Sequence, residues 1–200
     1  MSKYGEPKSQ QFSNLVLALL KLDNYTFNHS YRVHKLALLI GKELGLTPEQ
    51  LKQLEMGALF HDIGKVKIKR TILNKTTPLT NAEWELIKTH PQKGYKLVKN
   101  AKMSEVVQHI VLYHHRWVNG KGGYPLNPLK HFPCLLTQIV TVSDVVNAMT
   151  SKRPYRDALK LDDCIQYLVD NCSTAFNQKV VAKVIKLKEN GVLSKVMNTN

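Results

Sequence analysis

Hydrophobic residues recur at intervals of three and four along most of the chain, which is the spacing of a buried stripe on an amphipathic helix. Glycine-containing polar segments, rather than hairpin turns, separate these stretches. The pattern predicts an all-α protein that folds as a compact helical bundle. Helices are expected at residues 10–22, 28–44, 47–61, 80–88, 103–115, 134–151, 161–171 and 177–190, with a further one starting near residue 91, and residues 63–80 are expected to form an irregular crossing.

Two short motifs predict where helices start. Thr47-Pro48-Glu49-Gln50 and Thr80-Asn81-Ala82-Glu83 each place a threonine three residues before a glutamine or glutamate, which is the capping-box arrangement. Pro48 suits the first helical position because it has no amide hydrogen that would need a partner there.

The composition fits one globular domain. Of the 200 residues, 43% are hydrophobic and 8% are aromatic, which is enough for one sizeable core. The longest apolar run, residues 15–20, is too short to cross a bilayer, so no membrane span is expected. We expect a helix within residues 1–22 that packs on the core, a main domain at 23–190 and a flexible tail at 191–200.

The cysteines indicate a reducing compartment. Cys134, Cys164 and Cys172 are odd in number, and none of them forms a CxxC pair. This usage is typical of reduced thiols in the cytosol. A cytoplasmic location is therefore expected, and cysteine is not expected among metal ligands.

The chain is strongly basic, with a formal net charge of +14. A basic surface raises the local concentration of phosphates and other anions, although lysine-rich stretches also form ordinary solvated faces. Nucleic acid is not favoured as a partner, because aromatic residues are not interleaved with the cations outside residues 116–124. An acidic regulatory protein or a second copy of the chain in a homodimer stays compatible with the charge. Residues 10–22 could pack internally or dimerise, and internal packing is favoured.

Several polar side chains fall on the apolar faces of the predicted helices. Asp144 lies in line with Leu136, Val140 and Asn147, and an ionised carboxylate on such a stripe needs a cation beside it. A single histidine on an apolar face is usually a hydrogen-bonded core residue. Here, however, separate segments each supply a histidine or an aspartate, and together these predict a metal centre. The candidates are His29, His61, Asp62, His90, His114, His115 and Asp144. His34 and His109 lie five residues from candidate histidines, about 140° round a helix, and are expected to be structural or exposed.

The order of these motifs resembles the HD-GYP family, a branch of the HD-domain metal-dependent phosphohydrolases that is associated with cyclic di-GMP turnover. The resemblance covers residues 17–186. It rests on residues 23–33, His61-Asp62-Ile63-Gly64-Lys65, Leu79-Thr80, His90-Pro91, Gly94, His114-His115, Gly122-Gly123-Tyr124-Pro125, Asp144 and Arg153-Pro154-Tyr155-Arg156.

The resemblance implies that the seven candidates bind two divalent ions, with Asp62 bridging them. Iron or manganese is the family's usual metal, and zinc, cobalt or nickel also suit imidazole and carboxylate ligands. Some members hold a third ion through a glutamate one helical turn before the first histidine, and this chain has Tyr25 there. Two ions are therefore expected.

The same resemblance implies roles for other residues. Asp62 and Lys65 are expected to be catalytic, Asp62 through the metal pair and Lys65 by holding a phosphoryl oxygen or the leaving 3′ oxygen, unless Lys65 is simply solvated. Arg153 and Arg156 could grip a second phosphate or a guanine edge, or cap a helix. Tyr124 could stack on a base or pack the loop. Gly64 is expected to allow a tight turn.

The implied function is that of a bacterial signalling hydrolase: a phosphodiesterase that converts cyclic di-GMP to pGpG and/or GMP. Two alternatives stay open: a degenerate, non-hydrolytic module that binds a cyclic dinucleotide or a protein, and a phosphohydrolase acting on another nucleotide. The GYP loop departs from the family pattern because it lacks a glutamate after His115, has Asn119 in place of an aspartate and contains one inserted residue. Asn147 likewise replaces the second aspartate of the family's Asp-x-x-Asp motif. Such carboxylates orient ligating histidines, so these changes affect turnover more than metal binding.

Overall fold

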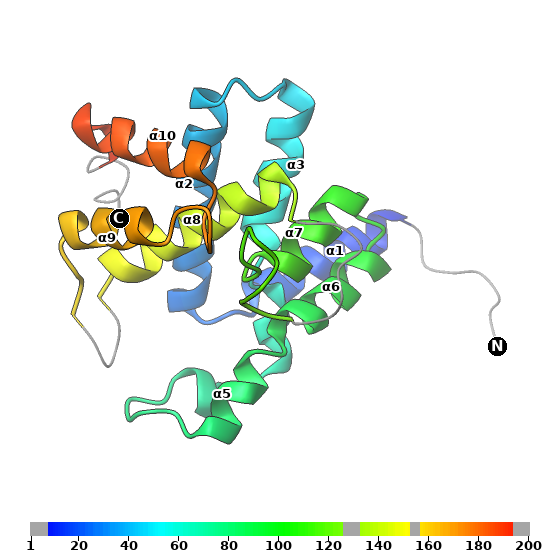
Figure 1. Ribbon diagram of the computed structural model, residues 1–200. Coiled ribbons are helices and arrows are strands. Elements are labelled where there is room, and N and C mark those ends of the chain that lie inside the picture. The colour runs from blue at the N-terminus through cyan, green and yellow to red at the C-terminus, as the bar shows by residue number, and fades with distance from the viewer. Residues whose placement is uncertain (1–7, 126–132, 153–156, 194–200) are drawn as a thin grey trace, which may run out of the picture.

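The computed structural model describes residues 8–125, 133–152 and 157–193, and this part of the chain is all-α, as predicted, without a strand (Figure 1). In chain order the elements are α1 (Lys8–Leu20), α2 (Asn24–Glu43), α3 (Pro48–Phe60), the 3-10 helix η1 (Ile63–Lys67), α4 (Arg70–Leu73), α5 (Asn81–Ile87), α6 (His90–Asn100), α7 (Glu105–Tyr113), α8 (Leu135–Thr150), α9 (Leu161–Asp170) and α10 (Gln178–Glu189). Across the same residues, no helix combines the length and hydrophobicity needed to cross a lipid bilayer.

The helix starts follow the side chains that cap them. Both predicted capping boxes are confirmed: Thr47 pairs reciprocally with Gln50 at the start of α3, and Thr80 with Glu83 at the start of α5. α2 begins earlier than predicted because the Asp23 carboxylate accepts the backbone amide of Thr26 at 2.9 Å. The prediction of an irregular crossing over residues 63–80 is wrong in part, since η1 and α4 form within it.

α8 is the central element of the bundle. It crosses the middle of the molecule, where α2, α3, α7, α9 and α10 all contact it (Figure 1). Such a position explains why ten of its sixteen residues are buried, polar ones included, because most of its faces are covered. The main core joins these helices through fully buried side chains that include Leu36, Leu54, Ile110, Ile139, Leu168 and Val184.

α1 packs on the bundle through a second, smaller core. Leu15, Leu19 and Leu22 are buried there against Phe60, Ile63 and Val98, among others. This is the internal packing that the sequence favours for this helix.

The functional region depends on a close approach between η1 and α6. A Cβ atom added at Gly64 would lie 1.9 Å from the carbonyl oxygen of His90 and 2.5 Å from the amide nitrogen of Gly94. Gly64 does not have a positive φ. The glycine is therefore required by backbone packing, not by the tight turn that the sequence suggests, and it brings the start of α6 up to the end of α3.

Candidate metal centre

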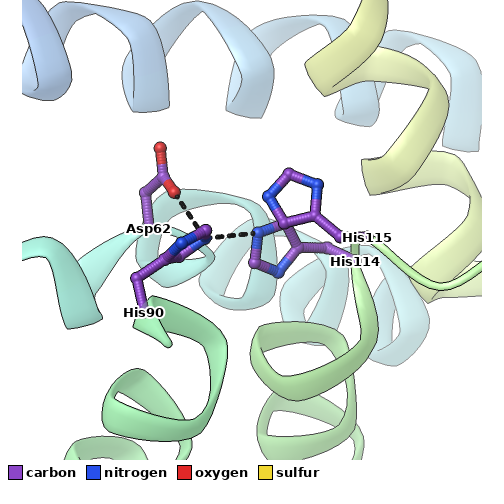
Figure 2. Close-up of side chains that lie close together, drawn as sticks. All are labelled: Asp62, His90, His114 and His115. Carbon is purple, nitrogen blue, oxygen red and sulfur yellow. Dashed lines mark hydrogen bonds and ion pairs between the residues drawn. The ribbon is translucent and has the colours of Figure 1, made fainter. Parts of the chain in front are cut away.

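All seven candidate ligands lie together at the centre of the bundle. His29 comes from α2, His61 and Asp62 follow α3, His90 opens α6, and the pair at 114–115 follows α7. Asp144 completes the set from α8. Their potential ligand atoms form two groups, each within 4.8 Å, one of Asp62, His90, His114 and His115 and the other of His29, His61 and Asp144. Figure 2 shows the first group, with the carboxylate of Asp62 directed toward the ring of His90 and the rings of His114 and His115 beside it.

Three of the histidine rings are oriented by the ends of helices. The Nδ1 atom of His61 lies 2.7 Å from the carbonyl oxygen of Ala58, which is three residues earlier. His90 makes the same contact with Ile87 at 2.8 Å, and His114 with Val111 at 3.0 Å. These carbonyls belong to the last turns of α3, α5 and α7, where the helix offers them no amide partner. With Nδ1–H donating to a carbonyl, Nε2 of each neutral ring carries a lone pair that faces the site.

His29 is held differently. Its Nδ1 atom lies 2.7 Å from the side-chain oxygen of Asn147, and its Nε2 atom lies 3.0 Å from Asp144 Oδ1. The amide of Asn147 therefore supplies the acceptor that a carboxylate would supply at this position. Asparagine in place of an aspartate at position 147 therefore removes a negative charge near the ligands but keeps the hydrogen bond that orients the ring of His29.

Asp62 lies between the two groups. Its Oδ1 atom is 3.1 Å from His90 Nε2 in the first group. Its Oδ2 atom is 3.5 Å from His61 Nε2 and 3.7 Å from His29 Nε2 in the second. Lys65 contacts the same Oδ2 at 2.6 Å. Each oxygen of one carboxylate thus faces a different group of imidazoles.

The arrangement fits a cation. The Nε2 atoms of His90 and His114 lie 3.2 Å apart, and neither ring can donate through Nε2 while it is neutral and donates through Nδ1. Two ligands of one ion, with metal–ligand bonds of about 2.1 Å, lie at a similar separation. His61 Nε2 is buried, and no other group in the described part of the chain hydrogen-bonds to it. These buried imidazoles and carboxylates form a set that could hold a divalent ion.

Burial and charge fix the protonation states of the site. Burial by itself raises the pKa of Asp62, but the ammonium of Lys65 and the neighbouring imidazoles outweigh it and hold that pKa well below its usual range. For Asp144, burial also raises the pKa, and the hydrogen bond from His29 more than reverses the effect. Burial lowers the pKa of His115 to about 3 and that of His114 well below its usual value. Burial also acts to lower the pKa of His61, but the carboxylates of Asp62 and Asp144 outweigh it and raise that pKa. The two carboxylates are thus ionised while His114 and His115 are neutral, which is the state in which these residue types bind metals.

A cavity of about 480 Å³ opens over the ligand cluster, and His29, Asp62, His90, His115 and Asp144 form the floor of this cavity. Lys65 and Tyr124 line it, together with the exposed edges of the ligand groups. The ring of Tyr124 stacks on His115, with centroids 4.5 Å apart, so it packs against the site and also faces the cavity. Gly123 brings it there: its φ is +74°, and a Cβ would lie 1.9 Å from the carbonyl oxygen of His115. Arg153 and Arg156, predicted to bind substrate, lie outside the described residues.

Several residues that build the site escaped the sequence analysis. The carbonyls of Ala58, Ile87 and Val111 orient rings, and Thr141 Oγ1 donates to the carbonyl of His114 at 2.7 Å. A signal for the carbonyls does exist, since a histidine just after an amphipathic helix lies within reach of its unpaired last-turn carbonyls. His34 and His109 belong to neither ligand group, as expected.

The fold and this cluster agree with a family comparison. A family model described as an HD domain matches residues 14–180, which is most of the chain. The chain belongs to the HD-domain family. The match begins inside α1, so the matched region includes part of that helix.

Curated relatives of this HD domain support the HD-GYP resemblance. The cyclic di-GMP phosphodiesterase response regulator RpfG of Xanthomonas campestris is 31% identical over 188 residues, covering 93% of this chain and 50% of the relative. A cyclic di-GMP phosphodiesterase of Thermotoga maritima is 30% identical over 84% of this chain and 46% of its own. A 3′3′-cGAMP-specific phosphodiesterase (3) of Vibrio cholerae is 30% identical over 81% of this chain and 35% of its own. The HD domain thus spans half or less of the length of these relatives.

Solved structures show the same fold. An HDG"Y"P protein from Bdellovibrio bacteriovorus superposes with a TM-score of 0.67 at 18% identity, covering 85% of this chain and 55% of that one. The HD domain of the L. monocytogenes phosphodiesterase PgpH superposes with a TM-score of 0.65 at 18% identity, covering 89% of this chain and 98% of that one. At these identities the likeness concerns the fold alone, and it confirms the predicted HD-type helical bundle.

Proposed function

We propose that this HD domain is a metal-dependent phosphodiesterase that hydrolyses cyclic di-GMP to pGpG and/or GMP. The observation that carries the proposal is the position of Asp62, whose two oxygens face the two ligand groups separately. That position suits a carboxylate that bridges two ions. The names of the relatives in Xanthomonas and Thermotoga support cyclic di-GMP as the substrate.

The ligand assignment follows the two groups. One ion would be held by His90, His114 and His115 and the other by His29, His61 and Asp144, with Asp62 shared. Ligation by nitrogen and oxygen without thiolate favours iron or manganese, and zinc, cobalt and nickel are also compatible. Divalent ions at such a site supply Lewis-acid chemistry, since they lower the pKa of water and neutralise charge on phosphoryl oxygens.

The chain's own residues bind and orient the substrate. Lys65, whose ammonium already lies 2.6 Å from Asp62, stands at the edge of the floor, where it can hold a non-bridging phosphoryl oxygen or the leaving 3′ oxygen. The ring of Tyr124 stacks on His115 at one side of the cavity and limits how a ligand can lie there. Arg153 and Arg156 stay in the proposal as contacts for a second phosphate or for a guanine edge.

Some broader features of the protein also stay proposals. We infer that residues 23–190 are the catalytic domain and that residues 1–22 support it. The predicted tail at 191–200 starts too early, because Leu193 is fully buried in the main core. The net charge of +14 supports an acidic regulatory partner. A homodimer and a cytoplasmic location also stay proposals.

The test combines metal content with product analysis. Protein purified without oxygen is analysed for metals, and the same sample is incubated with cyclic di-GMP, with products separated by chromatography. About two ions of iron or manganese per chain, together with linear product that Asp62→Asn no longer forms, would support the proposal. Metal-loaded protein that releases no product from any nucleotide would refute it.

The altered loop favours a second candidate, a non-hydrolytic module that binds a cyclic dinucleotide or a protein. Arg116 follows the histidine pair where the family carries a glutamate, and it is buried with an exposed fraction of 5%. Equal binding of cyclic di-GMP by the wild type and His61→Ala, without turnover, would favour this candidate. A third, hydrolysis of another nucleotide, is supported by the relatives named for 3′3′-cGAMP, and a substrate panel separates it from the first.

A further inference from the structure

One wall of the cavity is apolar and belongs to an arm of the molecule that the bundle does not bury. Five hydrophobic side chains from α4, α5 and the segment between them line this wall: Ile72, Leu73, Leu79, Trp84 and Ile87. Neither of the two hydrophobic cores includes any of them. α4 and α5 have no buried residue, and α5 stands away from the rest of the bundle (Figure 1). These side chains therefore line the cavity, and neither hydrophobic core depends on them.

Trp84 is the most exposed of the five, with an exposed fraction of 44%. A tryptophan left this open loses part of the burial energy of its large apolar surface, unless a ligand covers it. Its neighbour Glu83 fixes the local backbone: one carboxylate oxygen accepts from Lys75 Nζ at 2.6 Å and from the Thr80 amide at 2.7 Å. Trp84 therefore belongs to a short helix whose first turn is held in place by the two hydrogen bonds of Glu83.

The rest of the cavity is polar and charged. The floor holds the carboxylate and imidazole groups, and Lys65 and Lys75 add two ammonium groups. A ligand that matches the whole cavity therefore has an anionic part for the floor and a flat apolar part for the wall. A nucleotide has both parts, since its base offers a π-face that stacks on aromatic side chains.

We propose that the α4–α5 wall is a nucleobase subsite in which the indole of Trp84 stacks on one base of the ligand while the adjoining phosphate lies on the floor. The inference rests on the proposed function for the identity of the phosphodiester. It adds a base-stacking residue that neither the HD motif nor the GYP loop contains. Loss of one stacking platform weakens nucleotide binding about tenfold or more.

The chain offers a matched pair of reporters, because it has two tryptophans. Trp84 and Trp117 are equally exposed, each at 44%, and Trp117 does not line the cavity. Trp117→Phe leaves Trp84 as the sole indole, and Trp84→Phe leaves Trp117. Both metal-loaded variants are titrated with GMP and, separately, with ribose 5-phosphate, which carries the phosphate without a base.

Saturable quenching of the Trp117→Phe protein by GMP, with no quenching by ribose 5-phosphate, is the expected result. The fluorescence of the Trp84→Phe protein should not change. Equal responses of the two variants to GMP, an equal effect of the two ligands, or no quenching at all would overturn the subsite.

Kinetics give a second readout if the protein hydrolyses cyclic di-GMP. Trp84→Ala should raise KM about tenfold with little change in kcat, and Trp84→Phe should retain most of the affinity because it keeps an aromatic face. If Trp84→Ala hydrolyses cyclic di-GMP with an unchanged KM, the proposed base subsite is refuted and the proposed function is not affected. If GMP quenches Trp84 in a base-dependent way but the protein releases no product, the proposed function is refuted and the base subsite is still supported. Circular dichroism of Trp84→Ala checks its fold, and the phenylalanine variant carries the test if the alanine variant unfolds.

Discussion

Asn147 offers the sharpest test of how this site holds its ligands. Its side-chain oxygen lies 2.7 Å from Nδ1 of His29, and both residues are buried. Asn147→Ala removes the acceptor and leaves a buried N–H without a partner, which costs about 1–3 kcal/mol. Loss of the partner that orients a ligating histidine typically weakens metal binding by about 10–100-fold. The two estimates agree, since a tenfold change corresponds to about 1.4 kcal/mol.

Asn147→Asp should act in the opposite direction. A carboxylate accepts a stronger, charge-assisted hydrogen bond from the ring and adds negative charge near the bound cation. The metal-free variant should be less stable than the wild type, because a third buried carboxylate then lies close to Asp144 and is not fully compensated. Asn147→Asp is therefore expected to bind metal more tightly and to melt at a lower temperature once the metal is removed.

The assay is competition for Mn²⁺ between the protein and a metal-sensitive chelating dye. Ser143→Ala is the matched control: Ser143 is fully buried on the same helix, and its hydroxyl has no hydrogen-bond partner in the described part of the chain. The control should bind Mn²⁺ like the wild type. An Asn147→Ala protein with wild-type affinity would refute the idea that this hydrogen bond orients His29 for a metal.

Three further outcomes are expected. Gly64→Ala should lower the free energy of unfolding by more than about 2 kcal/mol in urea titrations, because its Cβ would lie 1.9 Å from the His90 carbonyl oxygen and the backbone would have to move; an unchanged midpoint would contradict this. Burial raises the pKa of Cys134, but hydrogen bonds from His109 and Thr137 outweigh it and lower the pKa to about 7, so its alkylation by iodoacetamide should reach half its maximal rate near pH 7 and slow as the pH falls. Cys164, whose pKa burial raises to about 11, should react far more slowly, and equal rates at neutral pH would count against the prediction. Chelation should lower the melting temperature of the wild type and not that of Asp62→Asn, because only a protein that binds the ion gains stability from it; equal shifts would show that Asp62 does not hold metal.

Much of the fold follows from local rules that the sequence displays. The capping boxes at Thr47 and Thr80 define helix starts because the same side chains that signal them make the hydrogen bonds. The apolar residues of α8 indicate a largely buried helix, whereas the sequence does not show which helices contact it. The start of α2 was missed because an aspartate cap at residue 23, without a glutamate or glutamine three residues on, is a weaker signal than a capping box.

The site was predictable at the level of residue types and not of geometry. Seven inward-facing polar residues could be listed from helical periodicity and from a family resemblance. The two-group arrangement depends on how five segments pack, which periodicity within one segment does not encode. The role of Gly64 shows the difference, since the atoms that exclude a side chain there belong to residues 90 and 94.

The apolar wall illustrates a further limit of the sequence and also a property of the molecule. Ligand groups come from long helices or from residues directly after them, so the bundle's core fixes their positions. The wall comes from α4 and α5, which bury no side chain in either core. Substitutions along that arm can therefore change how tightly a base is bound at little cost in folding energy, whereas substitutions at His61 or Asp62 change the chemistry itself. Metal binding and base recognition should consequently respond to different sets of mutations, and variants at Asn147 and Trp84 separate the two.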